Sequence, residues 1–549
     1  MTPDSSYRRK LDPVGESSVE PEGWAPQVRM IIESISNCCI SSRLLRAVAF
    51  DFILQTSMET RIDAIPVSRR HRTIALRVGL GLLIACLPLA LASCKASPES
   101  IDDPAALLNQ PGRRIDEYDA ALTAVEMRGL DEASTAALRR LVVAEGISYD
   151  VRSRAFDILA AHDRKALAEA IVNGLPRMGD LYWRETLCNK IAATKLEGTE
   201  IALVRGWANA IPAWTDDTKR PERLALAALV GESEVALFLM KTLRSANPAT
   251  EANLRIRCFE LLVRIGEEDV LIAALADPEQ TKGDALLTDL ATITRDLGIV
   301  PRNREEILWA RKLCEPSRAE FLAAAKIALA QLPEGRRSAL ELRSVAIAVA
   351  CAELRPDLLA RNEPEMYAEI ESRIKSRKKV SPDFSGFGGG FTENLYQSRD
   401  SLVWGDLAAM LIALEVLDEE KLLRAVFELA DRDREERSTE FGGVLALGKH
   451  KHGELMEFAP RVKSGDTRFE SSQALFDALY EGLFHVHFHA QSYNNDKYAG
   501  PHMGDFQFAL ASRANCLVFA FLSPDELGVD FYRHGPLVID LGAITRPEG

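Results

Sequence analysis

The fold of most of the chain is decided by stretches such as Leu-Arg-Ile-Arg-Cys-Phe-Glu-Leu-Leu, residues 254–262. Apolar residues recur there at steps of three and four, and charged residues fall on the opposite side, which is the pattern of an amphipathic helix. Residues 152–159 repeat the pattern. Because it extends over residues 117–375, where Ala, Leu, Glu and Arg dominate, we predict an α-helical region there.

These helical stripes are interrupted at a regular interval. Short acidic or glycine breaks lie at Asp163, Glu197, Glu232 and Glu267, which are 34, 35 and 35 residues apart. Such a period with two helices per unit indicates stacked hairpins that bury a core only against their neighbours. The region resembles a HEAT-type α-solenoid. The resemblance implies either a surface that holds a protein partner or a helical spacer.

Composition excludes several classes of protein. Hydrophobic residues make up 47% of the 549 residues and charged residues 27%, and the mean hydropathy is −0.07, so neither wholesale disorder nor a polytopic membrane protein fits. The net charge of −14 repels phosphate backbones, so nucleic acid is not an expected partner. The nine cysteines show no CxxC spacing. Cys188, Cys258 and Cys351 lie in apolar stripes, and we expect them in the core.

Residues 67–93 have the features of an export signal. Arg69, Arg70 and Arg72 precede fifteen uncharged residues, 78–92, which end in Leu-Ala-Ser-Cys at Cys94. This length is typical of a secretory signal rather than a membrane-spanning helix. The end of the segment resembles the lipobox of bacterial lipoproteins. That resemblance implies lipid on Cys94, membrane anchoring, and a cell-envelope location outside the cytoplasmic membrane. An uncleaved membrane anchor is the alternative.

Four further stretches complete the organisation before the last domain. Residues 1–66 precede the signal and are either untranslated or a disordered extension, while residues 94–116 are predicted as a linker. Residues 376–400 contain Ser-Gly-Phe-Gly-Gly-Gly-Phe at 385–391, which indicates a loop; no Lys-Ser/Thr follows, so a phosphate loop is not expected. Residues 401–435 resume the helical pattern and lead into a last domain, 436–549.

That last domain has a different composition. Seven of the nine histidines lie between residues 450 and 534. Short candidate strands are bounded by turn residues: Gly443–Leu447, Leu483–His489, Cys516–Phe521, Val529–Tyr532 and Leu537–Leu541. We therefore predict a multidomain chain in which an α-helical solenoid is followed by an α+β domain with a small mixed sheet.

Residues 484–490 read Phe-His-Val-His-Phe-His-Ala. On a strand, this alternation places His485, His487 and His489 on one face. Imidazoles two residues apart can chelate one zinc ion, for which a carboxylate is a common third ligand. Asp505 follows a turn that can fold back onto the strand, and Asp496 is the runner-up.

The order of acidic and histidine residues resembles a known family. Glu440 precedes a Gly-Gly-apolar strand, His487-Phe-His489 follows 47 residues later, and Asp505 closes the set. In this respect residues 418–549 are similar to the JAB/MPN (JAMM) metallopeptidases. The resemblance implies zinc held by His487, His489 and Asp505, with Glu440 as the general base in hydrolysis of a peptide or isopeptide bond.

The chain departs from the family at three points. Ala490 replaces the usual proline, His502 stands at the position of the oxyanion serine, and the interval between His489 and Asp505 is 16 residues, several more than usual. His502 can donate a hydrogen bond in place of the serine or bind the metal itself. Equally, the changes can mark a site that has lost peptide chemistry.

Other interpretations remain open from the sequence. The ligands can instead be His485 and His487, the base can be Glu481, or the histidines can lie on an open edge strand and bind nothing. A non-catalytic envelope scaffold and a cupin-like metal oxygenase are the alternative functions. The remaining histidines, His450, His452 and His534, are expected on turns at the surface.

Overall fold

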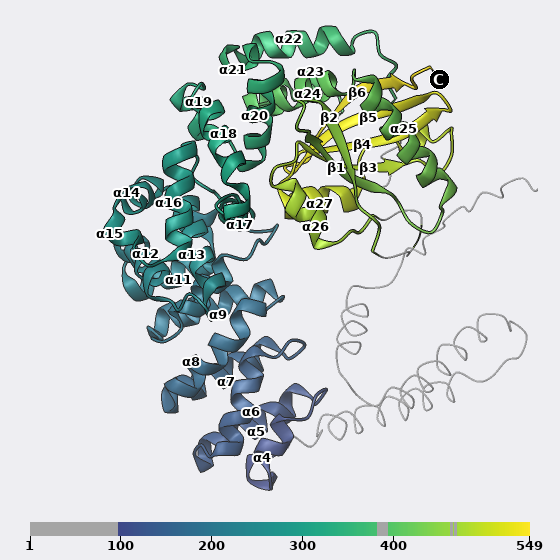
Figure 1. The fold of residues 1–549 in the computed structure, drawn as a ribbon. Coiled ribbons are helices and arrows are strands. Elements are labelled where there is room, and N and C mark those ends of the chain that lie inside the picture. Colours follow the sequence, from purple (N-terminus) through teal and green to yellow (C-terminus); the bar gives the residue numbers. More distant parts are fainter. Residues whose placement is uncertain (1–96, 381–392, 462–464, 466–468, 549) are drawn as a thin grey trace, which may run out of the picture. The chain divides into compact units, whose positions relative to one another are not determined.

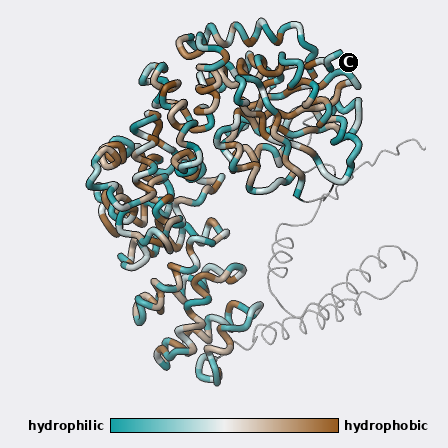
Figure 2. Tube along the Cα trace, viewed as in Figure 1, coloured by the Kyte–Doolittle hydropathy of each residue, from teal (hydrophilic) through white to brown (hydrophobic). Residues whose placement is uncertain are grey.

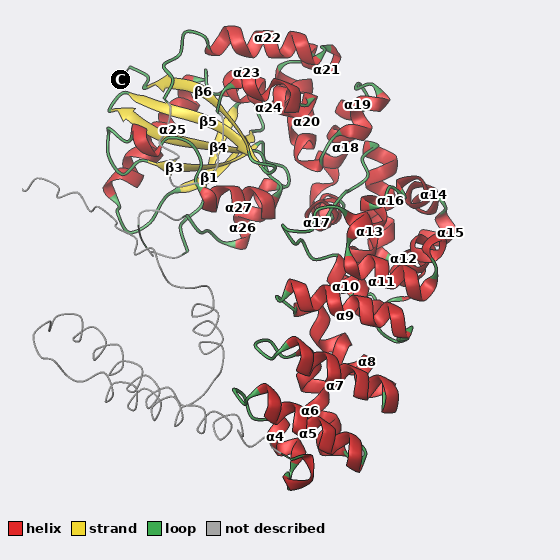
Figure 3. Ribbon diagram, turned by 180° about the vertical axis from the view of Figure 1, so that it is seen from behind, coloured by secondary structure: helices red, strands yellow, loops and turns green. Residues whose placement is uncertain are grey.

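The computed structural model describes residues 97–380, 393–461, 465 and 469–548. Residues 96–549 form one compact unit, in which helices come first and a sheet follows (Figures 1 and 3). The signal segment, Cys94, the extension 1–66 and the glycine-rich residues 385–391 lie outside the described residues. Among the helices that the structure describes, none is both long and apolar enough to cross a membrane.

The described α-helices before the sheet have the following bounds: α4 (Pro104–Leu108), α5 (Ile115–Arg128), α6 (Glu132–Val143), α7 (Tyr149–His162), α8 (Arg164–Gly174), α9 (Leu181–Thr194), α10 (Glu200–Trp207), α11 (Pro221–Val230), α12 (Val235–Ser245), α13 (Ala252–Arg264), α14 (Glu268–Ala276), α15 (Pro278–Thr281), α16 (Ala285–Leu297), α17 (Arg304–Leu313), α18 (Ala319–Leu329), α19 (Glu334–Ala339), α20 (Val345–Leu354), α21 (Asp357–Ala360), α22 (Glu363–Ile374), α23 (Leu395–Ser398), α24 (Trp404–Val416) and α25 (Glu420–Glu435). The predicted helical region is confirmed. The predicted linker is helical in part, because α4 lies within it.

The predicted breaks lie between helices. Asp163 ends α7 and caps α8 by accepting the backbone N–H of Ala166 at 2.9 Å, and Glu267 stands at the start of α14. A capping carboxylate satisfies a backbone donor that the helix itself leaves unpaired. Cys188, Cys258 and Cys351 are buried, as expected.

Buried arginines join successive helix pairs. Arg152 of α7 donates to Asp180, the N-cap of α9, at 2.7 Å. Arg255 of α13 makes the equivalent contact with Asp284, the N-cap of α16. Each arginine therefore neutralises a carboxylate that also caps the start of a helix. The ion pair holds the two neighbouring units in a fixed position relative to one another.

The sheet has six strands in the order β2-β1-β3-β4-β5-β6. Their bounds are β1 (Gly442–Leu447), β2 (Gly453–Glu457), β3 (Phe484–His489), β4 (Cys516–Ser523), β5 (Glu526–Arg533) and β6 (Leu537–Thr545). Only β3 and β4 pair in parallel, and α27 (Met503–Ser512) lies in the connection that parallel neighbours require. All five predicted strands are present, and β2 was not predicted. The helical part followed by an α+β domain with a mixed sheet is thus confirmed.

The two faces of the sheet are covered by different helices. On β3, Val486 and Phe488 face the opposite side from the histidines, and Phe521 of β4, on that same side, packs against Phe427 of α25 at 6.4 Å between ring centroids. The histidine face is covered by α27, whose Phe508 lies 4.1 Å from the His485 ring, and by α26 (Gln473–Leu479). Figure 2 shows the hydrophobic residues concentrated on the strands and on the inward sides of the helices.

Strand β3 lies between β1 and β4, and all six of its residues are buried. The interpretation of its histidines as residues on an open edge strand is therefore wrong. The reason is that α27 returns over the histidine face before β4 pairs with β3.

A buried polar network ties the helical part to the sheet. Arg343, just before α20, donates to Asp406 of α24 at 2.8 Å and to Asn515, just before β4, at 2.5 Å. Arg533 of β5 donates to the same Asp406 at 2.8 and 3.0 Å. His534 belongs to this network: it is buried, and its Nε2 lies 2.9 Å from Glu341. Its predicted surface position is wrong because its turn packs against the helical part.

Arg343→Met tests this network. The substitution leaves the buried Asp406 with one cationic partner instead of two, so we expect the free energy of unfolding to fall by about 3 kcal/mol, measured by urea denaturation of the full chain. As a control, Arg432→Met removes the exposed pair with Glu457 and should cost no more than about 1 kcal/mol. Equal effects of the two variants would contradict a structural role for the network.

Candidate metal centre

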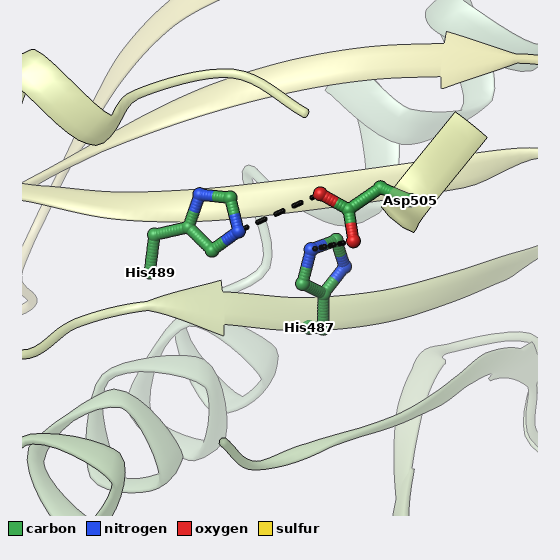
Figure 4. Close-up of side chains that lie close together, drawn as sticks. All are labelled: His487, His489 and Asp505. Atoms are coloured by element: carbon green, nitrogen blue, oxygen red, sulfur yellow. Dashed lines mark ion pairs between the residues drawn. The ribbon is translucent and has the colours of Figure 1, made fainter. Parts of the chain in front are cut away.

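Three of the predicted ligands converge on the histidine face. The Nε2 atom of His487 lies 3.2 Å from Oδ1 of Asp505, and Nε2 of His489 lies 3.6 Å from Oδ2 (Figure 4). One ligand atom from each residue falls within 4.8 Å of the others. The two histidines stand on β3 and Asp505 reaches them from the first turn of α27.

These separations suit a zinc ion. Zinc binds nitrogen and oxygen ligands at about 2.0–2.1 Å in tetrahedral geometry, which places two ligand atoms about 3.3 Å apart. The two measured separations, 3.2 and 3.6 Å, lie on either side of this value. Two histidines and a carboxylate also leave a fourth position for water, as in catalytic zinc sites.

The tautomer of His489 supports the same interpretation. Its Nδ1 lies 2.8 Å from the carbonyl oxygen of Tyr498, so Nδ1 carries the proton. Burial, followed by the charge of His487, lowers the pKa of His489 to about 3, so the ring is neutral and Nε2 presents a lone pair. A lone pair that faces a carboxylate oxygen is stabilised by a cation between them.

Asp505 and His487 compensate one another in the absence of a cation. Burial opposes the charge on Asp505, but the neighbouring His487 outweighs it and holds the Asp505 pKa well below its usual value. Burial likewise opposes protonation of His487, but the charges of Asp505 and then Glu440 and Asp433 raise its pKa. A cation at this point takes over the role that the imidazolium plays in the ion pair.

His502 lies beside this group. Its ring stacks on that of His489 with 4.6 Å between centroids, and burial lowers the His502 pKa. Its backbone N–H donates to Asp505 Oδ2 at 2.6 Å, which closes the first turn of α27. His502 therefore occupies the edge of the site and orients Asp505.

Glu440 lies close to the site. It precedes β1, is buried, and carries a charge that raises the pKa of both His487 and Tyr532. Such effects on the pKa of its neighbours are expected of a carboxylate that lies near the His487, His489 and Asp505 group without being part of it. The structure thus brings His487, His489, His502 and Asp505 together, and the charge of Glu440 acts on the pKa of His487.

The alternative residues lie elsewhere or make no hydrogen bond to the group. His485 is buried against Phe508, and neither of its ring nitrogens has a hydrogen-bond partner among the described residues. Asp496 is exposed, and Glu481 pairs with Arg318 at 3.0 Å. His450 and His452 are exposed on the turn between β1 and β2, as predicted.

Sequence reasoning missed Asp433 of α25. Its Oδ1 accepts the N–H of Phe441 at 2.6 Å and its Oδ2 accepts the N–H of Ala490 at 3.3 Å. One fully buried carboxylate therefore joins the residue after Glu440 to the residue after His489. A signal was present, because Asp433 falls on the apolar stripe of its helix with Val426, Leu429 and Ala430.

Comparisons with known proteins give no match: no protein-family model, curated protein or solved structure is significantly similar to this chain. The likeness to JAMM metallopeptidases, HEAT repeats and lipoprotein signals therefore rests on the residues alone.

Three carboxylic acids form a second buried group on the sheet. Asp530 of β5 lies opposite Asp540 of β6, whose N–H donates to the carbonyl of Glu393. Burial, followed by the charge of Asp540, raises the pKa of Glu393 to about 8. Burial and these neighbours also raise the pKa of Asp530. Glu393 is therefore largely protonated at neutral pH.

The raised pKa of Glu393 predicts a pH-dependent stability. The folded state binds this proton more tightly than the unfolded chain, in which the pKa is near 4.5, so the free energy of unfolding should fall as pH rises from about 5 to about 8. Glu393→Gln should flatten this fall, measured as urea midpoints at a series of pH values. The exposed Glu435→Gln is the control and should keep the wild-type slope; the same slope in both variants would contradict the prediction.

Proposed function

We propose that the protein is a zinc-dependent hydrolase that cleaves a peptide or isopeptide bond at His487, His489 and Asp505. The observation that carries the proposal is the convergence of these three ligand atoms within 4.8 Å beside a buried Glu440. The ordered set Glu440, H-x-H and Asp505 that resembles the JAMM metallopeptidases supports it from the sequence.

The division of roles follows from the chemistry of the residues. A zinc ion held by the three ligands would supply a polarised water and a Lewis acid for the scissile carbonyl. Glu440 takes the proton of the attacking water and passes it to the leaving amine, as a general base and then a general acid. Its burial next to His487 is consistent with a base held beside the ligands.

His502 is proposed to stabilise the oxyanion. Its lowered pKa keeps the imidazole neutral near pH 7, and a neutral imidazole still carries one N–H donor. A donor fixed in advance by stacking on His489 loses little freedom when negative charge develops on the substrate oxygen. In this respect His502 takes the part that serine has in the family the chain resembles.

The place of action is proposed from the N-terminal segment. The basic residues 69–72, the apolar segment 78–92 and Cys94 resemble a lipoprotein signal, which would anchor the chain by lipid in the cell envelope, outside the cytoplasmic membrane. Substrates would then be proteins or peptides of that compartment.

A non-catalytic scaffold is the second candidate. One observation favours it: the sheet shares a continuous hydrophobic core and the Arg343 network with the helical part, as a purely structural module would. In that case the helical part binds a protein partner and the histidine group binds no metal. Metal content separates the two candidates.

The zinc content of the purified full chain should be about one ion per chain by mass spectrometry. His487→Ala/His489→Ala should remove the zinc, whereas His450→Ala/His452→Ala, on the exposed turn, should retain it. A well-folded wild-type chain without metal after growth in zinc would refute the hydrolase and favour the scaffold.

Glu440→Gln should keep the zinc and lose hydrolysis. The amide cannot accept the proton of water, so we expect a fall in kcat of about 10²- to 10⁴-fold in a screen of peptide and isopeptide substrates. Glu481→Gln removes a carboxylate that pairs with Arg318 instead and should keep wild-type activity. Equal activity of Glu440→Gln and wild type would exclude Glu440 as the base.

A further inference from the structure

A pocket of about 350 Å³ opens between α10 and α13, and its wall carries three arginines. Arg177 follows α8, Arg205 lies on α10 and Arg257 on α13. Asn209 and Asn253 add amide groups to the same wall. We refer to it as the arginine pocket.

The positive charge of the arginine pocket is poorly balanced by its neighbours. Arg257 donates through one nitrogen, Nη1, to the carbonyl of Arg205 and to Asn209 Oδ1, which holds the guanidinium in place without neutralising it. Burial, and then the nearby cations Arg304 and Arg205, outweigh the attraction of Glu260 and lower the Arg257 pKa. The nearest ion pair is a loose one of 3.7 Å between Arg205 and Glu251.

This imbalance is unusual for the chain. The protein as a whole carries a charge of −14, and most other arginines of the helical part are paired with carboxylates, as Arg152 and Arg255 are. Arg177 is exposed and makes no ion pair among the described residues. The wall holds one carboxylate, Glu251, for its three arginines, and such an excess of forked cations is suited to bind carboxylates from another molecule.

A second pocket, of about 260 Å³, lies where α17 meets α26 and α27. Trp309 of α17 and Phe476 and Tyr480, from α26 and its end, provide aromatic walls. Arg304, the first residue of α17, lines this second pocket and is also close enough to Arg257 to lower its pKa. Helix α13 contacts both α10 and α17, so the two pockets lie on adjacent helices of one surface, formed by α10, α13 and α17.

We propose that this surface binds an acidic polypeptide in an extended conformation. Its carboxylates occupy the arginine pocket, its backbone meets the amide of Asn253, and an apolar side chain enters the second pocket. A single phosphate fits less well, because the cations are spread over three helices and an aromatic pocket continues the surface.

The position of the second pocket connects this surface with the metal centre. Ala511 and Ser512, at the end of α27, line the second pocket, and Asp505 stands in the first turn of the same helix. If the proposed hydrolase activity holds, the bound acidic chain is its substrate. Binding itself does not depend on the metal, so the two proposals can fail separately.

The test uses the full chain and a fluorescein-labelled peptide, Glu-Asp-Glu-Leu-Phe-Glu-Asp, followed by fluorescence anisotropy. Arg177→Glu/Arg304→Glu reverses two exposed charges that flank Arg257, and we expect about a tenfold or greater rise in Kd. Removal of metal with EDTA should leave this binding unchanged, because His487, His489 and Asp505 line neither pocket. Added salt should weaken binding to the wild type.

The control reverses the same number of charges elsewhere. Lys165→Glu/Lys241→Glu changes two exposed lysines of the helical part and should change the Kd less than twofold. The proposal is overturned if this control weakens binding as much, if the peptide with Gln and Asn in place of its acids binds equally well, or if the wild type shows no binding up to about 1 mM. Full displacement by inorganic phosphate at an equal concentration would overturn the polypeptide in favour of a simple anion site.

Discussion

The burial of three imidazoles on one central strand is the constraint on which the sheet domain depends. A polar side chain taken out of water destabilises the fold unless a partner replaces the water. Asp505 is that partner for His487 and His489, and the Tyr498 carbonyl is a second partner for His489. Among the residues that the structure describes, the ring nitrogens of His485 have no hydrogen-bond partner, and aromatic rings lie beside them. The strand is thus stable only because the loop after η8 (Asp496–Tyr498) and the start of α27 fold over it.

Buried carboxylates also connect distant segments elsewhere in the chain. Asp406 joins Arg343 of the helical part to Arg533 of the sheet, and Asp433 joins the start of β1 to the end of β3. Breaking such a group leaves a charge without a partner, which costs far more than an exposed ion pair contributes. Directional contacts of this kind hold Glu440 and His489 in fixed relation, whereas apolar packing alone would allow them to shift.

Much of this arrangement could be predicted from local pattern. The alternation over residues 484–490 predicted which side chains share a face, because the period of a strand is fixed at two. The apolar stripes of the helices and the breaks between them could be predicted equally well, because burial of one side of a helix places apolar residues at steps of three and four. The grouping of His487 and His489 with Asp505 rather than with Asp496 was also predicted.

The remaining features depend on contacts between distant segments. Strand β2 reads Gly-Glu-Leu-Met-Glu, with few residues that favour strands, and it forms because β1 offers an edge for pairing. His534 precedes a glycine in a turn, and only its contact with Glu341, 193 residues earlier, buries it. Asp433 stands out in the sequence because it is a carboxylate on an apolar stripe. Its two hydrogen-bond donors could not be predicted, because these N–H groups lie in other elements.

The three departures from the JAMM pattern correspond to particular contacts. Ala490 donates its backbone N–H to Asp433, and a proline at that position has no N–H to give. The longer interval before Asp505 contains Tyr498, whose carbonyl fixes the tautomer of His489. His502 closes the first turn of α27 through its backbone and stacks on His489 through its ring. Each of these contacts therefore positions a residue of the His487, His489 and Asp505 group or its immediate neighbour, which is the support that the proposed metal site would need.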